Sequence, residues 1–492
     1  MAVAPPDNGT PPDPSRPRSR FDRYFEITAR GSTMSREVRG GLATFFTMAY
    51  IVVLNPLILG RAVDGAGNTL PIPAIAAATA LIAGLMTILM GVVGRFPLAV
   101  AAGLGVNVLV AYEIAPEMTW ADAMGLVVIE GVIIAVLVLT GLRTAVFRSV
   151  PTQMKTAIGV GIGLFLTIIG LVDAGFVRRI PDVANTTVPV ELGIGGKLVS
   201  WPLLVFVVGL LVTLVLVVRR VKGAILIGIL ASTALAMVVE AFGKVGPSFV
   251  NGVPNPKGWA LNVPTLPSNP FQTPDLSLLG KFNVLGSWER AGWLVVLMFI
   301  FTLLITDFFD TMGTMVAVGQ EGGMLDEQGT PPRAKEILLA DSIAAAAGGA
   351  GSVSSNTSFV ESAAGVAEGA RTGVANLVTG GLFLLAMFVA PLVVVVPFEA
   401  ASVALVVVGF LMMTAVRTID WSDYEIAIPA FLTIVLMPFT YSISNGIGAG
   451  LIVYVVVKLA KRKSREIHPL PYAVAALFVV YFLRGPIESL IY

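Results

Sequence analysis

Long continuous runs of apolar residues, separated by short polar turns, dominate the pattern along this 492-residue chain. About 20 apolar residues span the hydrocarbon core of a bilayer as a helix, and the unbroken runs differ from the alternating strands of a membrane barrel. The pattern is therefore typical of an all-α polytopic membrane protein. It predicts fourteen transmembrane segments, at about residues 40–60, 71–94, 97–113, 120–141, 150–171, 201–218, 222–242, 292–318, 335–350, 352–370, 373–396, 398–416, 424–442 and 443–462.

Polar stretches divide the chain into five parts. These are an N-terminal tail (1–39), a first set of seven spans (40–242), a Pro-rich linker (243–291), a second set of seven spans (292–462) and a C-terminal segment (463–492). We expect the last apolar stretch of the C-terminal segment to be an interfacial or re-entrant helix, with a fifteenth span as the alternative.

Positive charges predict the orientation, because Lys and Arg collect on the cytoplasmic side. They fall on one side if the N-terminus is cytoplasmic and the linker extracellular. The charges that we count in these cytoplasmic turns include Arg95, Lys155, Arg219, Arg333 and the run from Lys458 to Arg465.

Seven spans on each side of a linker enter the membrane in opposite senses, which is the plan of inverted-repeat transporters. The third span of each half is interrupted. In the first half, residues 96–109 contain Pro97, Gly103 and the polar Asn107, and in the second half residues 348–365 are rich in Gly and Ser. Paired interrupted segments point to a substrate site, since half-helix ends direct free N–H groups at it. We expect Asn107 to contact the substrate.

Three carboxylates lie in apolar surroundings in the second half. Asp307 and Asp310 are three residues apart, so they share one helix face, and Glu361 lies in the interrupted segment. A carboxylate at the bilayer centre costs about 2.5–3.5 kcal/mol on an insertion scale, so it usually faces a cavity and has a function. We find no Lys or Arg in the middle of a span to pair with Asp307. Two close carboxylates do not both ionise freely, so one can carry a proton, as a proton-coupled carrier requires.

Each of these residues also has a structural interpretation. Asp310 could brace a neighbouring helix, and Asn107 could bond to one. Ser355 or Asn356 is expected to cap the helix that follows.

Composition narrows the functional classes. The chain is 56% hydrophobic and 13% charged with a net charge of +1, so no polyanionic partner is indicated. It has no cysteine and one histidine, which argues against thiol chemistry and against a metal-dependent membrane enzyme. An anion carrier would place a cation beside its site, whereas acids dominate here. A channel is another class of answer beside a saturable carrier. We do not expect an enzyme, because no cluster of His, Cys or metal ligands supports one, and no cofactor is expected.

Four motifs resemble the nucleobase–cation symporter family, and within it the adenine/guanine/hypoxanthine permease branch. They are Gly41-Leu-Ala-Thr-Phe-Phe-Thr-Met-Ala-Tyr-Ile-Val-Val-Leu-Asn-Pro56, Gly103-Leu-Gly-Val-Asn107, Thr306-Asp-Phe-Phe-Asp-Thr-Met-Gly313 and Ser354-Ser-Asn-Thr-Ser-Phe-Val-Glu-Ser-Ala-Ala-Gly365. The resemblance covers about residues 21–485. The chain lacks the proline that usually precedes the third-span Asn in the family, since it has Ala101-Ala-Gly-Leu-Gly105 there.

The resemblance implies fourteen spans in a seven-plus-seven inverted repeat. A core domain (spans 1–4 and 8–11) and a gate domain (spans 5–7 and 12–14) would hold the substrate between them. The broken third and tenth spans would carry short antiparallel strands. The implied function is import of hypoxanthine, guanine or adenine by proton symport across the cell membrane, often as a homodimer. Uracil, xanthine or anion transport on the same fold is the alternative.

Carried onto this chain, the resemblance makes Asp307 and Glu361 the two acidic substrate-site residues and Asn107 the polar third-span residue. Asp310 becomes a second functional acid, so Asp307, Asp310 and Glu361 are the candidates for proton coupling. A purine also has a flat face, against which Phe308 or Phe359 could stack, although core packing is the ordinary role of such rings. Ser358, beside Phe359, completes the predicted substrate contacts.

Overall fold

The computed structural model describes residues 19–141, 150–179, 190–250, 253–260, 262–267, 269–326 and 330–483. The start of the predicted tail, residues 1–18, and the end of the predicted C-terminal segment, residues 484–492, lie outside the described residues.

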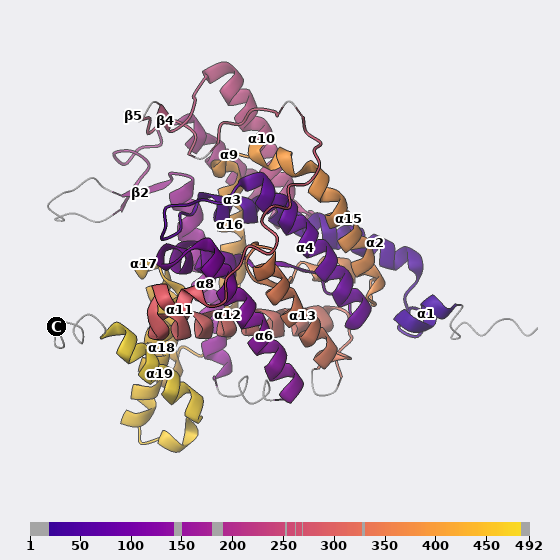
Figure 1. Ribbon diagram of the computed structural model, residues 1–492, viewed down its shortest axis with the longest axis vertical. Coiled ribbons are helices and arrows are strands. Elements are labelled where there is room, and N and C mark those ends of the chain that lie inside the picture. The colour runs from indigo at the N-terminus through magenta and orange to yellow at the C-terminus, as the bar shows by residue number, and fades with distance from the viewer. Residues whose placement is uncertain are drawn as a thin grey trace, which may run out of the picture.

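Helices make up most of the described chain (Figure 1). The first half contains α1 (Arg20–Phe25), α2 (Met34–Met48), α3 (Ile51–Arg61), α4 (Ile72–Val93), α5 (Leu104–Leu109), α6 (Trp120–Thr140), α8 (Thr152–Asp173), α9 (Trp201–Val218) and α10 (Ala224–Gly243). The second half contains α11 (Gly286–Arg290), α12 (Gly292–Glu321), α13 (Ala334–Ala350), α14 (Ser362–Ala367), α15 (Val374–Ala386), α16 (Phe398–Met413), α17 (Tyr424–Thr440), α18 (Ile443–Ala460) and α19 (Pro469–Phe482). Short π or 3₁₀ segments cover Val110–Ile114, Ala115–Glu117, Met387–Val395, Thr414–Thr418 and Ser464–Glu466.

Many of these helices have the length and hydrophobicity of membrane-spanning helices. Among the described residues, nine helices or runs of joined helices are long and apolar enough to cross one. Shorter apolar helices cover Gly292–Phe308, Tyr424–Phe439 and Pro469–Phe482. The chain is therefore a multi-pass helical membrane protein.

The two interrupted segments contain short strands that pair with each other. Strand β1 (Val100–Ala102) precedes α5, and β6 (Asn356–Ser358) precedes α14. They run antiparallel with the register Val100–Ser358, Ala101–Thr357 and Ala102–Asn356. This is the pairing implied by the resemblance. The other strands form two short hairpins, β2 (Val177–Arg179) with β3 (Val190–Leu192) and β4 (Phe249–Val250) with β5 (Val253–Pro254).

Side chains of neighbouring helices bond to polar backbone groups of strand β1 and of the residues just before it. Thr87 of α4 accepts from the N–H of Val100 at 3.0 Å and donates to its carbonyl at 2.9 Å. Asn376 of α15 donates to the carbonyls of Phe96 at 3.1 Å and Leu98 at 2.7 Å. Away from water every backbone group needs such a partner, so these bonds make non-helical backbone tolerable inside the protein.

The helices pack into two groups. In the first, α6 contacts α12 and α13, and α4 contacts α3 and α15, with α2 against α14 and α15. In the second, α8 contacts α16, α9 contacts α10 and α17 contacts α18. Close approach in the first group requires glycine: a Cβ on Gly373 would overlap the carbonyl oxygen of Gly91.

Ion pairs connect the two groups. Arg61, the last residue of α3, lies 2.6 Å from Asp173 at the end of α8. Glu368, which follows α14, pairs with Lys222 just before α10. The helix groups are thus joined through charged side chains as well as apolar packing.

Candidate functional site

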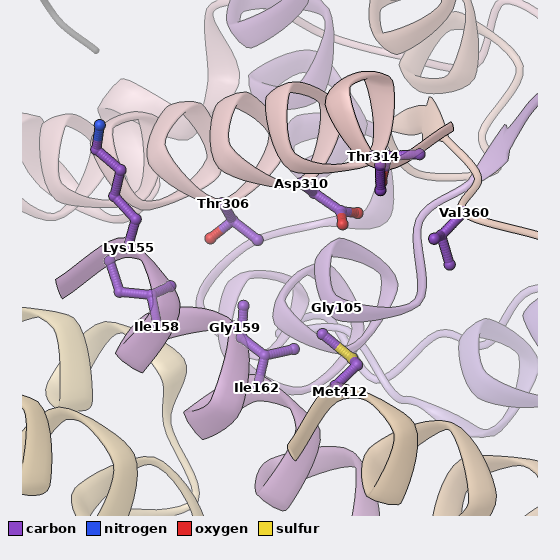
Figure 2. A pocket seen from close by; sticks show the side chains of 11 residues that line it. Gly105, Lys155, Ile158, Gly159, Ile162, Thr306, Asp310, Thr314, Val360 and Met412 are labelled. Atoms are coloured by element: carbon purple, nitrogen blue, oxygen red, sulfur yellow. The ribbon is translucent and has the colours of Figure 1, made fainter. Parts of the chain in front are cut away.

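A central cavity lies between the two helix groups. It consists of a larger part of about 300 Å³ and a smaller part of about 100 Å³. The two parts share Gly105, Asp310, Thr314, Val360 and Met412 as lining residues. In Figure 2, which shows the larger part, α12 and the β6–α14 connection supply one wall and α8 another.

Asp310 is the acid that both parts of the cavity share. Its side chain is exposed to the cavity, and Figure 2 shows its carboxylate directed away from α12. Its Oδ2 accepts a hydrogen bond from the Thr357 hydroxyl at 3.3 Å. Because Thr357 belongs to β6, the carboxylate lies beside the paired strands β1 and β6.

Glu361 also lines the cavity, in its smaller part. It follows β6 and immediately precedes α14. The hydroxyl of Tyr50, which lies between α2 and α3, donates to its Oε1 at 2.6 Å. Tyr50 is only 1% exposed, and it lines the same part of the cavity as Glu361. The expected cap by Ser355 or Asn356 is wrong, because α14 starts after Glu361 without a side-chain cap.

Ser358 and Phe359 line the smaller part of the cavity as well. The Ser358 hydroxyl donates to Oδ1 of Asp341 on α13 at 2.8 Å, and Thr311 of α12 donates to Oδ2 of Asp341 at 2.7 Å. Asp341 is therefore a buried anchor that ties β6 to α12 and α13. Phe359 is 6% exposed, which fits both a cavity wall and a core residue.

Three predicted site residues lie behind the cavity wall. Asp307 and Asn107 are fully buried and Phe308 is 2% exposed, and none of them is among the described lining residues. Neither side-chain polar atom of Asn107 has a hydrogen-bond partner within the part of the chain that the structure describes. The structure thus brings Asp310, Glu361, Ser358 and Phe359 to one cavity and leaves Asp307, Asn107 and Phe308 adjacent to it.

Sequence reasoning missed two residues of the site. Lys155, in the first turn of α8, lines the larger part of the cavity, although we counted it as a cytoplasmic turn charge. The acids of the cavity therefore share its described lining with a cation. A charge inside the predicted 150–171 span was the available signal. Tyr50 was hidden in an apolar run, and no local pattern links it to Glu361.

Comparisons with known proteins agree with this architecture. Residues 35–448 match the Permease family (Xan_ur_permease). Guanine/hypoxanthine permease PbuG of Bacillus subtilis (strain 168) is 38% identical over 465 residues, which cover 94% of this chain and 99% of PbuG. Adenine permease AdeP of Escherichia coli (strain K12) is 33% identical over 94% of this chain and 95% of its own length.

A solved structure shares the fold. The transmembrane domain of the cyanobacterium bicarbonate transporter BicA matches with a TM-score of 0.57 at 15% identity, covering 85% of this chain and 97% of that domain. The family match and the relatives named as permeases identify a membrane transport protein. The chain belongs to the Permease family, and its relatives confirm the resemblance to the adenine/guanine/hypoxanthine permease branch.

Proposed function

We propose that this protein imports purine nucleobases by proton symport across the cell membrane. The observation that carries the proposal is that Asp310 and Glu361 line one cavity between the two helix groups. A purine presents N–H groups along the edge of a flat ring, and carboxylates accept from such groups. The substrate class is supported by relatives that are named as guanine/hypoxanthine and adenine permeases.

The proposal includes fourteen spans in a seven-plus-seven inverted repeat. The pattern of helix contacts supports it. If α4, α6, α9 and α10 correspond to α13, α15, α17 and α18, then the α6–α13 contact mirrors α15–α4 and the α9–α10 contact mirrors α17–α18. If α8 corresponds to α16 as well, the contact of α8 with α17 mirrors that of α16 with α9, and β1 pairs with its own counterpart β6. Such mirrored contacts are expected of a pseudo-two-fold repeat.

In this proposal the first helix group is the core domain and the second the gate domain, with a cytoplasmic N-terminus and an extracellular linker. Movement of one group against the other would expose the cavity to each side in turn. Asp310 and Glu361 bind the base and exchange the coupled proton. Asp307, Asn107 and Phe308 remain proposed contributors, because they belong to α12 and α5, which also line the cavity. The homodimer is supported by the family resemblance alone.

Coupling follows if the affinity for the base differs between protonation states. Protonation from outside would favour loading of the base, and release of the proton inside would weaken binding. If the base bound equally well to both protonation states, the proton gradient could not drive accumulation of the substrate.

The test is uptake of radiolabelled hypoxanthine, guanine, adenine, xanthine and uracil by cells that lack their own permeases, with and without a protonophore. Wild type is compared with Glu361→Gln at matched membrane expression. Protonophore-sensitive uptake of purines by wild type, lost in the variant, is expected. Uptake of xanthine or uracil alone would replace the substrate assignment, and no saturable uptake of any base would refute it.

A further inference from the structure

The central cavity lies toward one end of the space between the two helix groups. On α8 its lining residues run from Lys155, in the first turn, to Ile162, and Figure 2 shows them along one wall. On α16 the lining residues include Met412, near the end of that helix. Beyond Ile162, α8 continues to Asp173, its last residue, for about 16 Å at a rise of 1.5 Å per residue. The central cavity thus does not reach this far end of α8.

A second cavity, of about 380 Å³, lies at the far end of α8. Its lining includes Arg61, Asp173 and Glu399, together with linker residues between Ser248 and Ala260. We call it the outer cavity, because the proposed orientation places the linker outside the cell. None of its described lining residues also lines the central cavity. The two cavities are therefore separate, and the contacts between them decide whether they can join.

Arg61 is one such contact between the helix groups. It is the last residue of α3, in the first group, and it touches two helices of the second group. Its Nη1 donates to Oδ1 of Asp173 at 2.6 Å, and its guanidinium carbon lies 4.8 Å from the ring centroid of Phe398, the first residue of α16. The side chain of Asp173 is only 5% exposed, and an ion pair shielded from water attracts more strongly than one in bulk water. Arg61 therefore holds α3 against one end of both α8 and α16.

Glu113 makes a second contact of this kind. It belongs to the π-helical segment Val110–Ile114, which follows α5 and packs against α6 of the first group. Its carboxylate accepts from the hydroxyl of Ser442 at 2.8 Å and from the N–H groups of Ile443 and Ser444. Ser442 is the N-cap of α18, so these N–H groups belong to the first turn and have no partner within the helix. The helix dipole also favours a carboxylate at this position. Glu113 thus binds the start of a second-group helix.

Both contacts lie on the same side of the membrane in the proposed orientation. The end of α8, with Asp173, and the turn before α18, with Ser442, are both extracellular, whereas Lys155 marks the cytoplasmic end of α8. The lining of the central cavity comes from the cytoplasmic part of α8, and the outer cavity lies beyond Arg61. The structure therefore describes a conformation in which the two helix groups are joined on the extracellular side.

We infer that Glu113 and Arg61 are gating residues that keep the central cavity closed to the outside. Their bonds to α18 and to Asp173 have to break before the helix groups separate there and a substrate can enter from the outer cavity. The inference rests on the proposed transport by movement of one helix group against the other, and it adds the residues that control one of the two openings.

A single cysteine can report on access to the central cavity, because the chain has no cysteine of its own. Gly159→Cys places it in the cavity wall, where a Cβ on Gly159 would meet nothing within 4 Å. A membrane-impermeant maleimide is added to intact cells and, separately, to inside-out vesicles, and the labelling rate is measured on each side. Glu113→Gln and Arg61→Gln are each combined with this reporter. Lys222→Gln is the matched control, because Lys222 also pairs across the groups, with Glu368, but lies in a turn assigned to the cytoplasmic side.

The reporter alone is expected to label faster from the cytoplasmic side. Glu113→Gln and Arg61→Gln should each raise the ratio of outside to inside labelling at least about tenfold, since each weakens hydrogen bonds to a charged group at the closed end. Lys222→Gln should not raise this ratio. A general loosening of the fold would speed labelling from both sides and leave the ratio unchanged.

Fluorescence size-exclusion chromatography identifies the variants that fold, and because Glu113 and Arg61 lie on different elements, either one that folds provides the test. An unchanged ratio in the folded variants, or an equal rise with Lys222→Gln, would overturn the inference. Labelling needs no substrate, so it decides the inference even where the uptake assay refutes purine transport.

Discussion

The contact between Tyr50 and Glu361 allows a sharp test of the site. Tyr50→Phe removes one hydroxyl and keeps the ring, which is 1% exposed and packed in the first helix group. The lost bond is the 2.6 Å donation to Glu361 Oε1. If that bond positions the carboxylate for the substrate, the substitution should change transport with little change in packing.

The size of the effect follows from the kind of bond. A hydrogen bond to a charged group contributes about 1.5–3 kcal/mol. Glu361 lines the cavity, where water can replace the missing donor, so we expect the lower end of this range. Since about 1.4 kcal/mol corresponds to a factor of ten, kcat/KM for the transported base should fall about tenfold.

The assay is concentration-dependent hypoxanthine uptake, with folded protein quantified in the same membranes. Tyr112→Phe is the matched control, because the buried Tyr112 hydroxyl has no hydrogen-bond partner within the described residues and does not line the cavity. It should transport like wild type. Tyr50→Phe with wild-type kinetics, or with a loss explained entirely by less folded protein, would refute the positioning role.

Other predictions concern the scaffold of the site. Gly373→Ala should abolish most folded protein in size-exclusion chromatography, because its Cβ would overlap the Gly91 carbonyl between α4 and α15; normal yield would contradict that packing. Asn376→Ala removes a donor from the carbonyls of Phe96 and Leu98, and only the Phe96 carbonyl keeps another donor among the described residues, the N–H of Leu98. Thermal unfolding should therefore show a loss of about 1–3 kcal/mol, and an unchanged Tm would count against it. Burial alone would raise the pKa of the Asp64 carboxyl, but hydrogen bonds from backbone N–H groups outweigh this effect. The pKa of Asp64 therefore lies below its ordinary value. Its stabilising effect is thus present above about pH 4 and is lost as the pH falls through the lower folded-state pKa. Asp64→Asn should lower the Tm at pH 7, with the difference from wild type shrinking below about pH 4, and a constant difference would contradict this.

Long apolar runs made much of the fold predictable. The predicted 201–218 span coincides with α9, because its ends are marked by Ser200 before an apolar run and by Arg219 after it. The paired interruptions were also predictable, since Gly and Ser in an otherwise apolar span break a helix. The strand register was not, because it depends on pairing between residues more than 250 positions apart, such as Val100 and Ser358.

The sequence predicted that carboxylates form the candidate site, but it did not predict every residue of that site. Asp307 and Asp310 differ by about 60° around a helix, so one can reach a narrow cavity while the other remains buried, and spacing alone does not say which. Lys155 illustrates the same problem at a helix end, where a residue in a cytoplasmic turn and one facing a cavity have the same sequence pattern. Tyr50 depends on a contact with Glu361 that only the tertiary structure creates.

The central claim is coupled movement of a purine base and a proton through the cavity that contains Asp310 and Glu361. Purified protein in proteoliposomes containing a pH-sensitive dye tests it most directly. Adding hypoxanthine outside, with no imposed gradient, should acidify the lumen for wild type and leave it unchanged for Glu361→Gln. Hypoxanthine entry by wild type without any lumenal acidification would contradict proton symport.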